Sequence, residues 1–127
     1  MADPPQPTPR PWKHKFQCAF SGLKAGIRGH SSFSVHFFAA ITVLLGAACL
    51  QCQPQEWAIL CVCITLVIGF ELANSTDALL VRCLPEGERS KFHPALDVGA
   101  GTVLFVSAGS LVVGVLVLLP KILSLPA

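Results

Sequence analysis

The hydrophobic positions of the chain fall into three long runs that short polar segments separate. The runs cover residues 33–50, 57–81 and 98–119. A membrane-spanning helix needs about 20 mostly apolar residues. The middle run is apolar only over residues 57–70 before it meets Glu71, so we expect its helix to continue to Val81 in order to cross. The pattern therefore predicts three transmembrane helices.

Ahead of these runs, residues 12–29 have an amphipathic pattern. Their large apolar side chains recur every three or four residues, at Trp12, Phe16, Phe20, Leu23 and Ile27. The charges on the other faces are all basic, and such a helix beside a span lies on the bilayer surface, where anionic lipids attract it. The alternative, a surface helix of a soluble protein, fits less well because an apolar run follows at once. Residues 1–11, with five prolines, are predicted to be a disordered tail, and residues 12–127 a single membrane domain.

Composition agrees with a small membrane protein and excludes other classes. Of the 127 residues, 53% are hydrophobic and only 13% are charged, which is too apolar for one small soluble core or for a disordered chain. A formal net charge of +2 is too small for a protein that binds nucleic acid. The fold class we expect is all-α: an integral membrane protein with an N-terminal amphipathic surface helix and three transmembrane helices.

The distribution of Lys and Arg predicts the orientation in the membrane. Five of them lie before the first span and three between the second and third, against none between the first and second and one after the third. Basic residues concentrate in cytoplasmic segments. We therefore expect the N-terminus in the cytoplasm and the C-terminus outside.

Polar residues interrupt the second span at its cytoplasmic end, at Glu71, Asn74 and Asp77. Their three-residue spacing predicts a stripe along one side of the helix. An ionisable residue inside a span indicates function, because a charge in lipid is costly. A carboxylate in such a site is suited to remove a proton from a lipid hydroxyl, so Glu71 is the candidate catalytic base, and Asn74 could hold the hydroxyl or a phosphate. Alternatively, the stripe only pairs with Arg82 or binds helices together.

Further candidate residues are expected at the same membrane depth. Asp97 opens the third span, and Arg28 and His30 end the surface helix. Asp97 could act through Mg²⁺ or through a bound cationic group. His36, within the first span, is interpreted as an inward-facing helix residue rather than a metal ligand.

Two other patterns have a structural interpretation. The third span is rich in small residues, among them Gly99, Gly101 and Gly109, which indicates close helix packing and favours an oligomer. Cys49 and Cys52 form a C-x-x-C pair at the outer end of the first span. The pair has no second C-x-x-C or His partner, so we do not expect a redox or metal site there.

The segment over residues 70–76 reads FELANST, which has the form E-x-x-N-[ST]. On either side of it lie residues 16–36, FQCAFSGLKAGIRGHSSFSVH, and the run LDVGAGTVLF that follows His93 and Pro94. Together these segments resemble the prokaryotic diacylglycerol kinase family, which includes undecaprenol kinases. The resemblance implies a multi-pass enzyme of the bacterial inner membrane that forms homotrimers with composite active sites. It also implies transfer of the γ-phosphate of ATP to a lipid alcohol, with Mg²⁺ as the metal.

The resemblance assigns roles to individual residues of this chain. Glu71 takes the position of the catalytic base, Asn74 that of the family's amide, and Asp97 that of the Asp in a Lys-Asp pair. Arg28 joins Asn74 and Asp97 as a candidate for binding substrate or nucleotide. Asp77 and His30 are the candidate metal ligands.

The chain also departs from the family pattern. His30 and Ala78 stand where the family has acidic metal ligands, Arg82 stands in place of a further Asp, and Leu96 in place of the Lys that contacts the nucleotide phosphates. A weakened Mg²⁺ site is therefore expected. The alternative function is a catalytically inactive relative that serves as a membrane scaffold or binds lipid. A small transporter fits least, because the outer halves of the spans are apolar.

Overall fold

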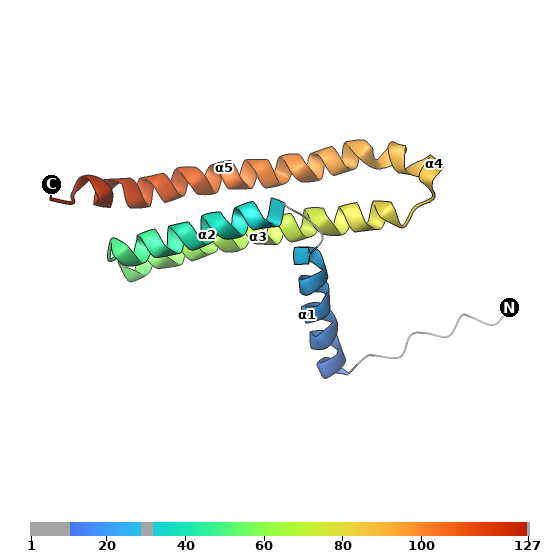
Figure 1. Ribbon diagram of the computed structural model, residues 1–127, viewed down its shortest axis with the longest axis horizontal. Coiled ribbons are helices and arrows are strands. Elements are labelled where there is room, and N and C mark those ends of the chain that lie inside the picture. Colours follow the sequence, from blue (N-terminus) through green and yellow to red (C-terminus); the bar gives the residue numbers. More distant parts are fainter. Residues whose placement is uncertain (1–10, 29–31, 127) are drawn as a thin grey trace.

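The computed structural model describes residues 11–28 and 32–126, and within these ranges the chain is helical except for short connections. Its elements in order are α1 (Trp12–Arg28), α2 (Ser32–Cys49), α3 (Pro54–Arg82), α4 (Glu86–Arg89), the 3-10 turn η1 (Ser90–Phe92) and α5 (His93–Leu123). Helices α2, α3 and α5 run alongside one another, and α1 runs across them (Figure 1). The predicted all-α fold is confirmed.

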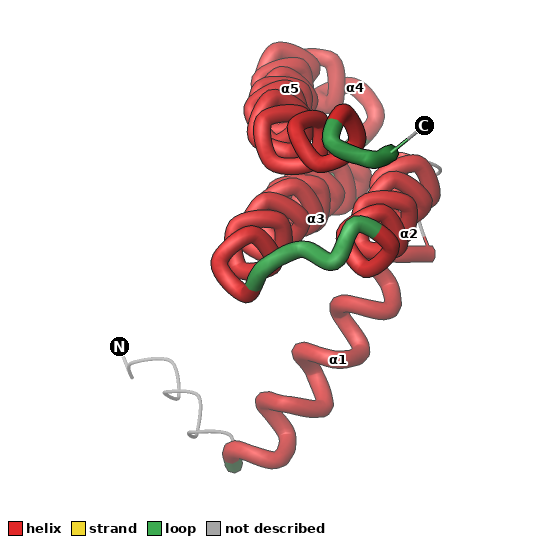
Figure 2. The backbone as a smooth tube through the Cα atoms, turned by 90° about the vertical axis from the view of Figure 1, so that its left-hand side faces the viewer, coloured by secondary structure: helices red, strands yellow, loops and turns green. Residues whose placement is uncertain are grey.

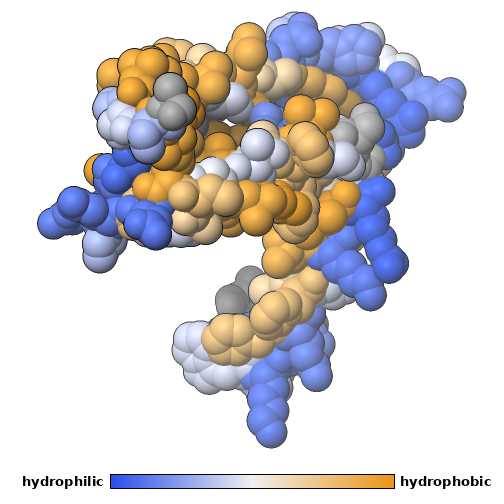
Figure 3. Space-filling model, turned by 60° about the vertical axis from the view of Figure 1, so that its left-hand side comes forward, coloured by the Kyte–Doolittle hydropathy of each residue, from blue (hydrophilic) through white to orange (hydrophobic). Residues whose placement is uncertain are grey.

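Three of the helices, α2, α3 and α5, are long and apolar enough to span a membrane. Their 18, 29 and 31 residues correspond to about 27, 43 and 46 Å at 1.5 Å per residue, against a hydrocarbon core of roughly 30 Å. Helices α3 and α5 therefore extend beyond the apolar core. Figure 3 shows hydrophobic residues over the middle of the bundle and hydrophilic residues near its ends.

The helix starts differ from the predicted spans for local reasons. Helix α3 begins three residues before the predicted start, because Gln53 and Glu56 form a capping box and Pro54 occupies the first turn. In this box the backbone N–H of Gln53 donates to Glu56 Oε2 at 2.6 Å. Helix α5 likewise begins at His93 rather than residue 98, because Pro94 fits a first turn, where no intrahelical N–H bond is lost.

Helix α5 extends four residues beyond residue 119, where the predicted third span ends. The helix continues to Leu123 with Pro120 inside it. Pro120 has no N–H to donate to the carbonyl of Leu116 four residues earlier, whereas the backbone N–H of Ser124 donates to the Pro120 carbonyl at 3.1 Å. Lys121 Nζ lies 3.0 Å from Glu56 Oε2, so an ion pair joins the end of α5 to the start of α3.

Helix α3 is the centre of the bundle, since it packs against α5, α2 and α1. Seen nearly along their axes, the three long helices lie side by side and α1 projects from them (Figure 2). Few apolar side chains are buried between the helices, and large ones such as Phe105, which is 81% exposed, cover the outside. This distribution suits a bundle that acyl chains surround, because lipid imposes no penalty on exposed apolar groups.

Helix α1 contacts α3 next to Glu71, the candidate base. Gly26 is buried, and a Cβ added to it would lie 2.9 Å from Leu72 Cδ2, so the two helices touch closely at this point. The large apolar side chains of α1, such as Trp12 and Phe20, are exposed along one face and are free to enter lipid. The contact brings α1 next to the residue that follows Glu71 in α3.

Candidate active site

Glu71 is the most buried ionisable residue among those that the structure describes, with 3% of its surface exposed. It lies on the side of α3 that faces α2. The hydroxyl of Ser32 donates a hydrogen bond to Glu71 Oε1, and His36 Nε2 lies 3.9 Å from Oε2. Ser32 and His36 are one helical turn apart on α2, so each carboxylate oxygen has a polar neighbour from the same helix.

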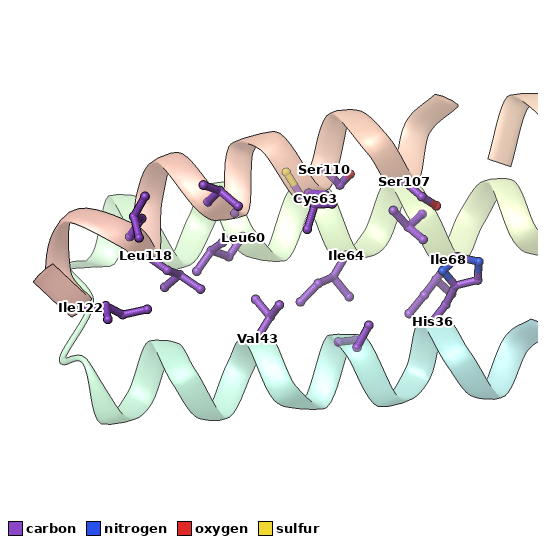
Figure 4. Close-up of a pocket in the computed structure, with 17 residues that line it drawn as sticks. His36, Val43, Leu60, Cys63, Ile64, Ile68, Ser107, Ser110, Leu118 and Ile122 are labelled. Atoms are coloured by element: carbon purple, nitrogen blue, oxygen red, sulfur yellow. The ribbon is translucent and has the colours of Figure 1, made fainter. Parts of the chain in front are cut away.

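An apolar groove ends beside this carboxylate. A cavity of about 510 Å³ lies between α2, α3 and α5, with a lining that is mostly aliphatic and has His36, Ser107 and Ser110 as its polar side chains. Figure 4 shows His36 and Ile68 toward one end of it and Ile122 at the other. On α3 the lining residues Ile64 and Ile68 share a face with Glu71, which they precede by seven and three residues. Glu71 does not line the groove itself but contacts His36, which does, and the groove volume lies within the range of ligand pockets.

Asn74 and Asp77 face a different helix from Glu71, which corrects the expectation of one polar stripe. A Cβ added to Gly99 of α5 would lie 2.5 Å from Asn74 Oδ1 and 3.7 Å from Asp77 Oδ2. A side chain three residues further along a helix is turned by about 60° relative to the first. Asn74 and Asp77 are therefore turned toward α5, whereas Glu71 points toward α2. The close packing expected from small residues is present at Gly99, but Gly101 has no neighbour within 4 Å.

Asn74 and Asp77 bring an amide oxygen and a carboxylate oxygen close to the same point beside Gly99. Both lie within 4 Å of the point that a Gly99 side chain would fill. No group of three or more His, Cys, Asp or Glu suited to a metal occurs among the described residues. Mg²⁺ is commonly held by one or two protein oxygens together with substrate phosphates. An amide and a carboxylate oxygen are compatible with that arrangement, and His30 lies outside the described residues.

Asp97 and Arg28 are not brought to Glu71 within one chain. Asp97 is exposed and precedes Gly99 by two residues, about 200° around the helix, so it points away from Asn74. Arg28 is exposed at the end of α1. In the described ranges no ion pair joins Arg82 to a carboxylate, so the alternative in which Arg82 neutralises the polar residues is not seen.

The structure also adds two residues that the sequence reasoning did not connect with the site, Ser32 and His36. His36 does face inward, with 20% of its side chain exposed, but its partner was not foreseen. The available signal was their spacing of four residues at the start of an otherwise apolar span. Of the family positions that differ, Ala78 and Leu96 are both half-buried.

Comparison with known proteins gives a consistent result. The chain is 27% identical over 111 residues to a protein named diacylglycerol kinase from Synechocystis sp., in a match that covers 87% of this chain and 63% of that relative. It is 27% identical over 107 residues to a protein named undecaprenol kinase from Bacillus subtilis, covering 84% of this chain and 87% of the relative. No solved structure matches the chain significantly.

The family comparison covers most of the fold. The family described as prokaryotic diacylglycerol kinase matches residues 17–118, which include most of α1, both α2 and α3, and most of α5. Nothing in these comparisons favours the inactive-scaffold alternative. The extent of the match shows that the chain belongs to the prokaryotic diacylglycerol kinase family.

Proposed function

We propose that this protein is a membrane lipid kinase that transfers the γ-phosphate of ATP to the hydroxyl of a lipid alcohol, diacylglycerol or undecaprenol. The observation that carries the proposal is the position of Glu71, a buried carboxylate near the end of an apolar groove and next to the contact between α1 and α3. The family and the names of the two relatives support it.

The proposed reaction follows from this arrangement. The apolar chain of the substrate lies in the groove between α2, α3 and α5, and its hydroxyl end lies beside Glu71. Glu71 accepts the hydroxyl proton as the lipid oxygen bonds to the γ-phosphorus. The bond from that phosphorus to the bridging oxygen breaks, and ADP leaves. A positioned general base contributes roughly 10²–10⁴-fold to such a step.

The polar residues beyond Glu71 are proposed to serve the nucleotide. Asn74 and Asp77 offer their oxygens to Mg²⁺, which when bound offsets the negative charge on the phosphates. Arg28 is suited to contact phosphate oxygens through its guanidinium group. Asp97 points away from its own chain's Asn74, so we propose that it acts across a homotrimer interface, where a neighbouring copy completes the site.

The distribution of Lys and Arg supports an orientation with this site on the ATP side. With eight of its nine Lys and Arg before the first span or between the second and third, the N-terminus is proposed to lie in the cytoplasm of a bacterial cell. The inner membrane is the corresponding location. Asn74 and Asp77 then lie on the cytoplasmic side of Glu71.

The test is a transfer assay with protein purified in detergent micelles. ATP labelled at the γ-phosphate is incubated with Mg²⁺ and with diacylglycerol or undecaprenol in parallel, and labelled lipid is separated by chromatography. Label on one of the two lipids supports the proposal and identifies the substrate. Folded protein that labels neither lipid would contradict the proposal and favour the scaffold alternative.

A further inference from the structure

His36 is the strongly polar side chain in the wall of an otherwise apolar groove. It lies in α2, where the 18 helical residues carry no formal charge, and it is four-fifths buried. A polar group is costly in such a position unless it has a partner. The partner in the structure is Glu71, so this pair and the hydrogen bond from Ser32 to Glu71 form the polar contact between α2 and α3 near the groove end.

The contacts on the two carboxylate oxygens are complementary. Ser32 donates to Oε1 and His36 approaches Oε2, from positions one turn apart on α2. A carboxylate with a partner on only one oxygen can rotate about its last side-chain torsion, which has a broad energy profile. Partners on both oxygens stop that rotation. The remaining lone pairs of the carboxylate are then held in one direction, as a base that accepts a proton from a substrate hydroxyl requires.

We propose that His36 is a positioning residue for the reaction, which donates from Nε2–H to Glu71 Oε2 and, together with Ser32, fixes the orientation of the base. The inference rests on the proposed lipid kinase function. The distance of 3.9 Å is about 1 Å longer than a hydrogen bond. Catalytic hydrogen bonds are often long without substrate and shorten in the reactive complex, so a small closure of the groove completes this one.

The kinetic test compares two replacements of His36. His36→Leu removes the donor, and kcat should fall roughly 10- to 100-fold, the loss expected for one hydrogen bond to a charged group. KM for the lipid should change little, because the groove keeps its apolar wall. His36→Gln keeps an N–H donor within reach of Glu71 and should recover most of kcat.

Matched variants separate positioning from a general effect on α2. Thr42→Val removes a polar group from the same helix, whose hydroxyl bonds only to the Phe38 carbonyl, and should leave kcat unchanged. In the double variant Ser32→Ala/His36→Leu, the fold-loss in kcat should be smaller than the product of the fold-losses in the two single variants, because both residues hold the same carboxylate. A normal kcat in His36→Leu, or a His36→Gln variant no better than His36→Leu, would overturn the proposal.

A second measurement tests the contact without using activity. Nitrogen-15 spectra of the histidine rings in micelles report the hydrogen bonding of each ring, and the His36 signals are identified by their loss in His36→Gln. Glu71→Gln should move the His36 signals and leave those of His14, on α1, in place. If the His36 signals do not move, the contact is not formed and the proposal fails. If wild-type protein transfers no phosphate but the signals move, the lipid kinase function fails while the contact stands.

Discussion

Replacement of Gly99 by alanine should disturb the contact between α5 and the polar end of α3. The new Cβ would lie 2.5 Å from Asn74 Oδ1, whereas ordinary contact begins at about 3.4 Å, so the amide must move by about 0.9 Å. Overpacking of this kind typically costs about 1–3 kcal/mol. The same substitution at Gly101 adds a methyl group where no atom lies within 4 Å, and so has no such cost.

The two alanine variants form a matched pair. Both exchange Gly for Ala inside α5, so the helix-propensity gain of up to about 1 kcal/mol appears in both and cancels in the difference. Gly99→Ala should therefore be less stable than Gly101→Ala by about 1–3 kcal/mol, measured by denaturant unfolding in micelles. It should also need more Mg²⁺ for half-maximal transfer, because Asn74 is displaced. Equal stability and equal Mg²⁺ dependence in the two variants would refute the close approach at Gly99.

Three further predictions test other parts of the account. In single-cysteine variants, a membrane-impermeant maleimide added outside the cell should modify Cys52 and spare Cys83, and the reverse pattern would overturn the orientation. Lys121→Met should lower the unfolding temperature slightly, without changing phosphate transfer, because it removes the ion pair between the end of α5 and the start of α3. A large loss of activity would show that this end of the bundle belongs to the site. Ala78→Glu should lower the Mg²⁺ concentration for half-maximal transfer several-fold, and the double variant Ala78→Glu/His30→Glu should lower that concentration further. No change in the double variant would mean that the present ligands already form a complete site.

Much of the fold could be predicted because hydrophobic periodicity reports helices directly. The amphipathic spacing in residues 12–29 and the apolar runs fixed the number and type of the long helices. The helix ends were harder, because they depend on local chemistry: the capping box at Gln53 extends α3, and Pro120 does not stop α5. A proline within a helical pattern usually ends or kinks the helix, so the sequence pattern did not predict that α5 continues past Pro120.

The candidate site was only partly predictable. Burial of Glu71 follows from its place in an apolar run, and the structure agrees. Its partners, Ser32 and His36, lie 39 and 35 residues away along the chain, so their contact depends on how α2 packs against α3. The sequence also did not predict that Glu71 faces α2 while Asn74 and Asp77 face α5. The spacing of residues in a helix gives the directions of side chains relative to one another, but it does not say which neighbouring helix each side chain contacts.

The measurement that tests the account most directly is phosphate transfer by Glu71→Gln beside the wild-type protein. Glutamine keeps the size of the side chain and its ability to accept a hydrogen bond from Ser32, but it is not a base. Glu88→Gln is the control, because it changes an exposed carboxylate on the connection before α5. We predict that wild type and Glu88→Gln transfer the γ-phosphate to a lipid alcohol at similar rates, and that Glu71→Gln is roughly 10²–10⁴-fold slower while still folded. Transfer by Glu71→Gln at the wild-type rate would contradict the assignment of Glu71 as the catalytic base.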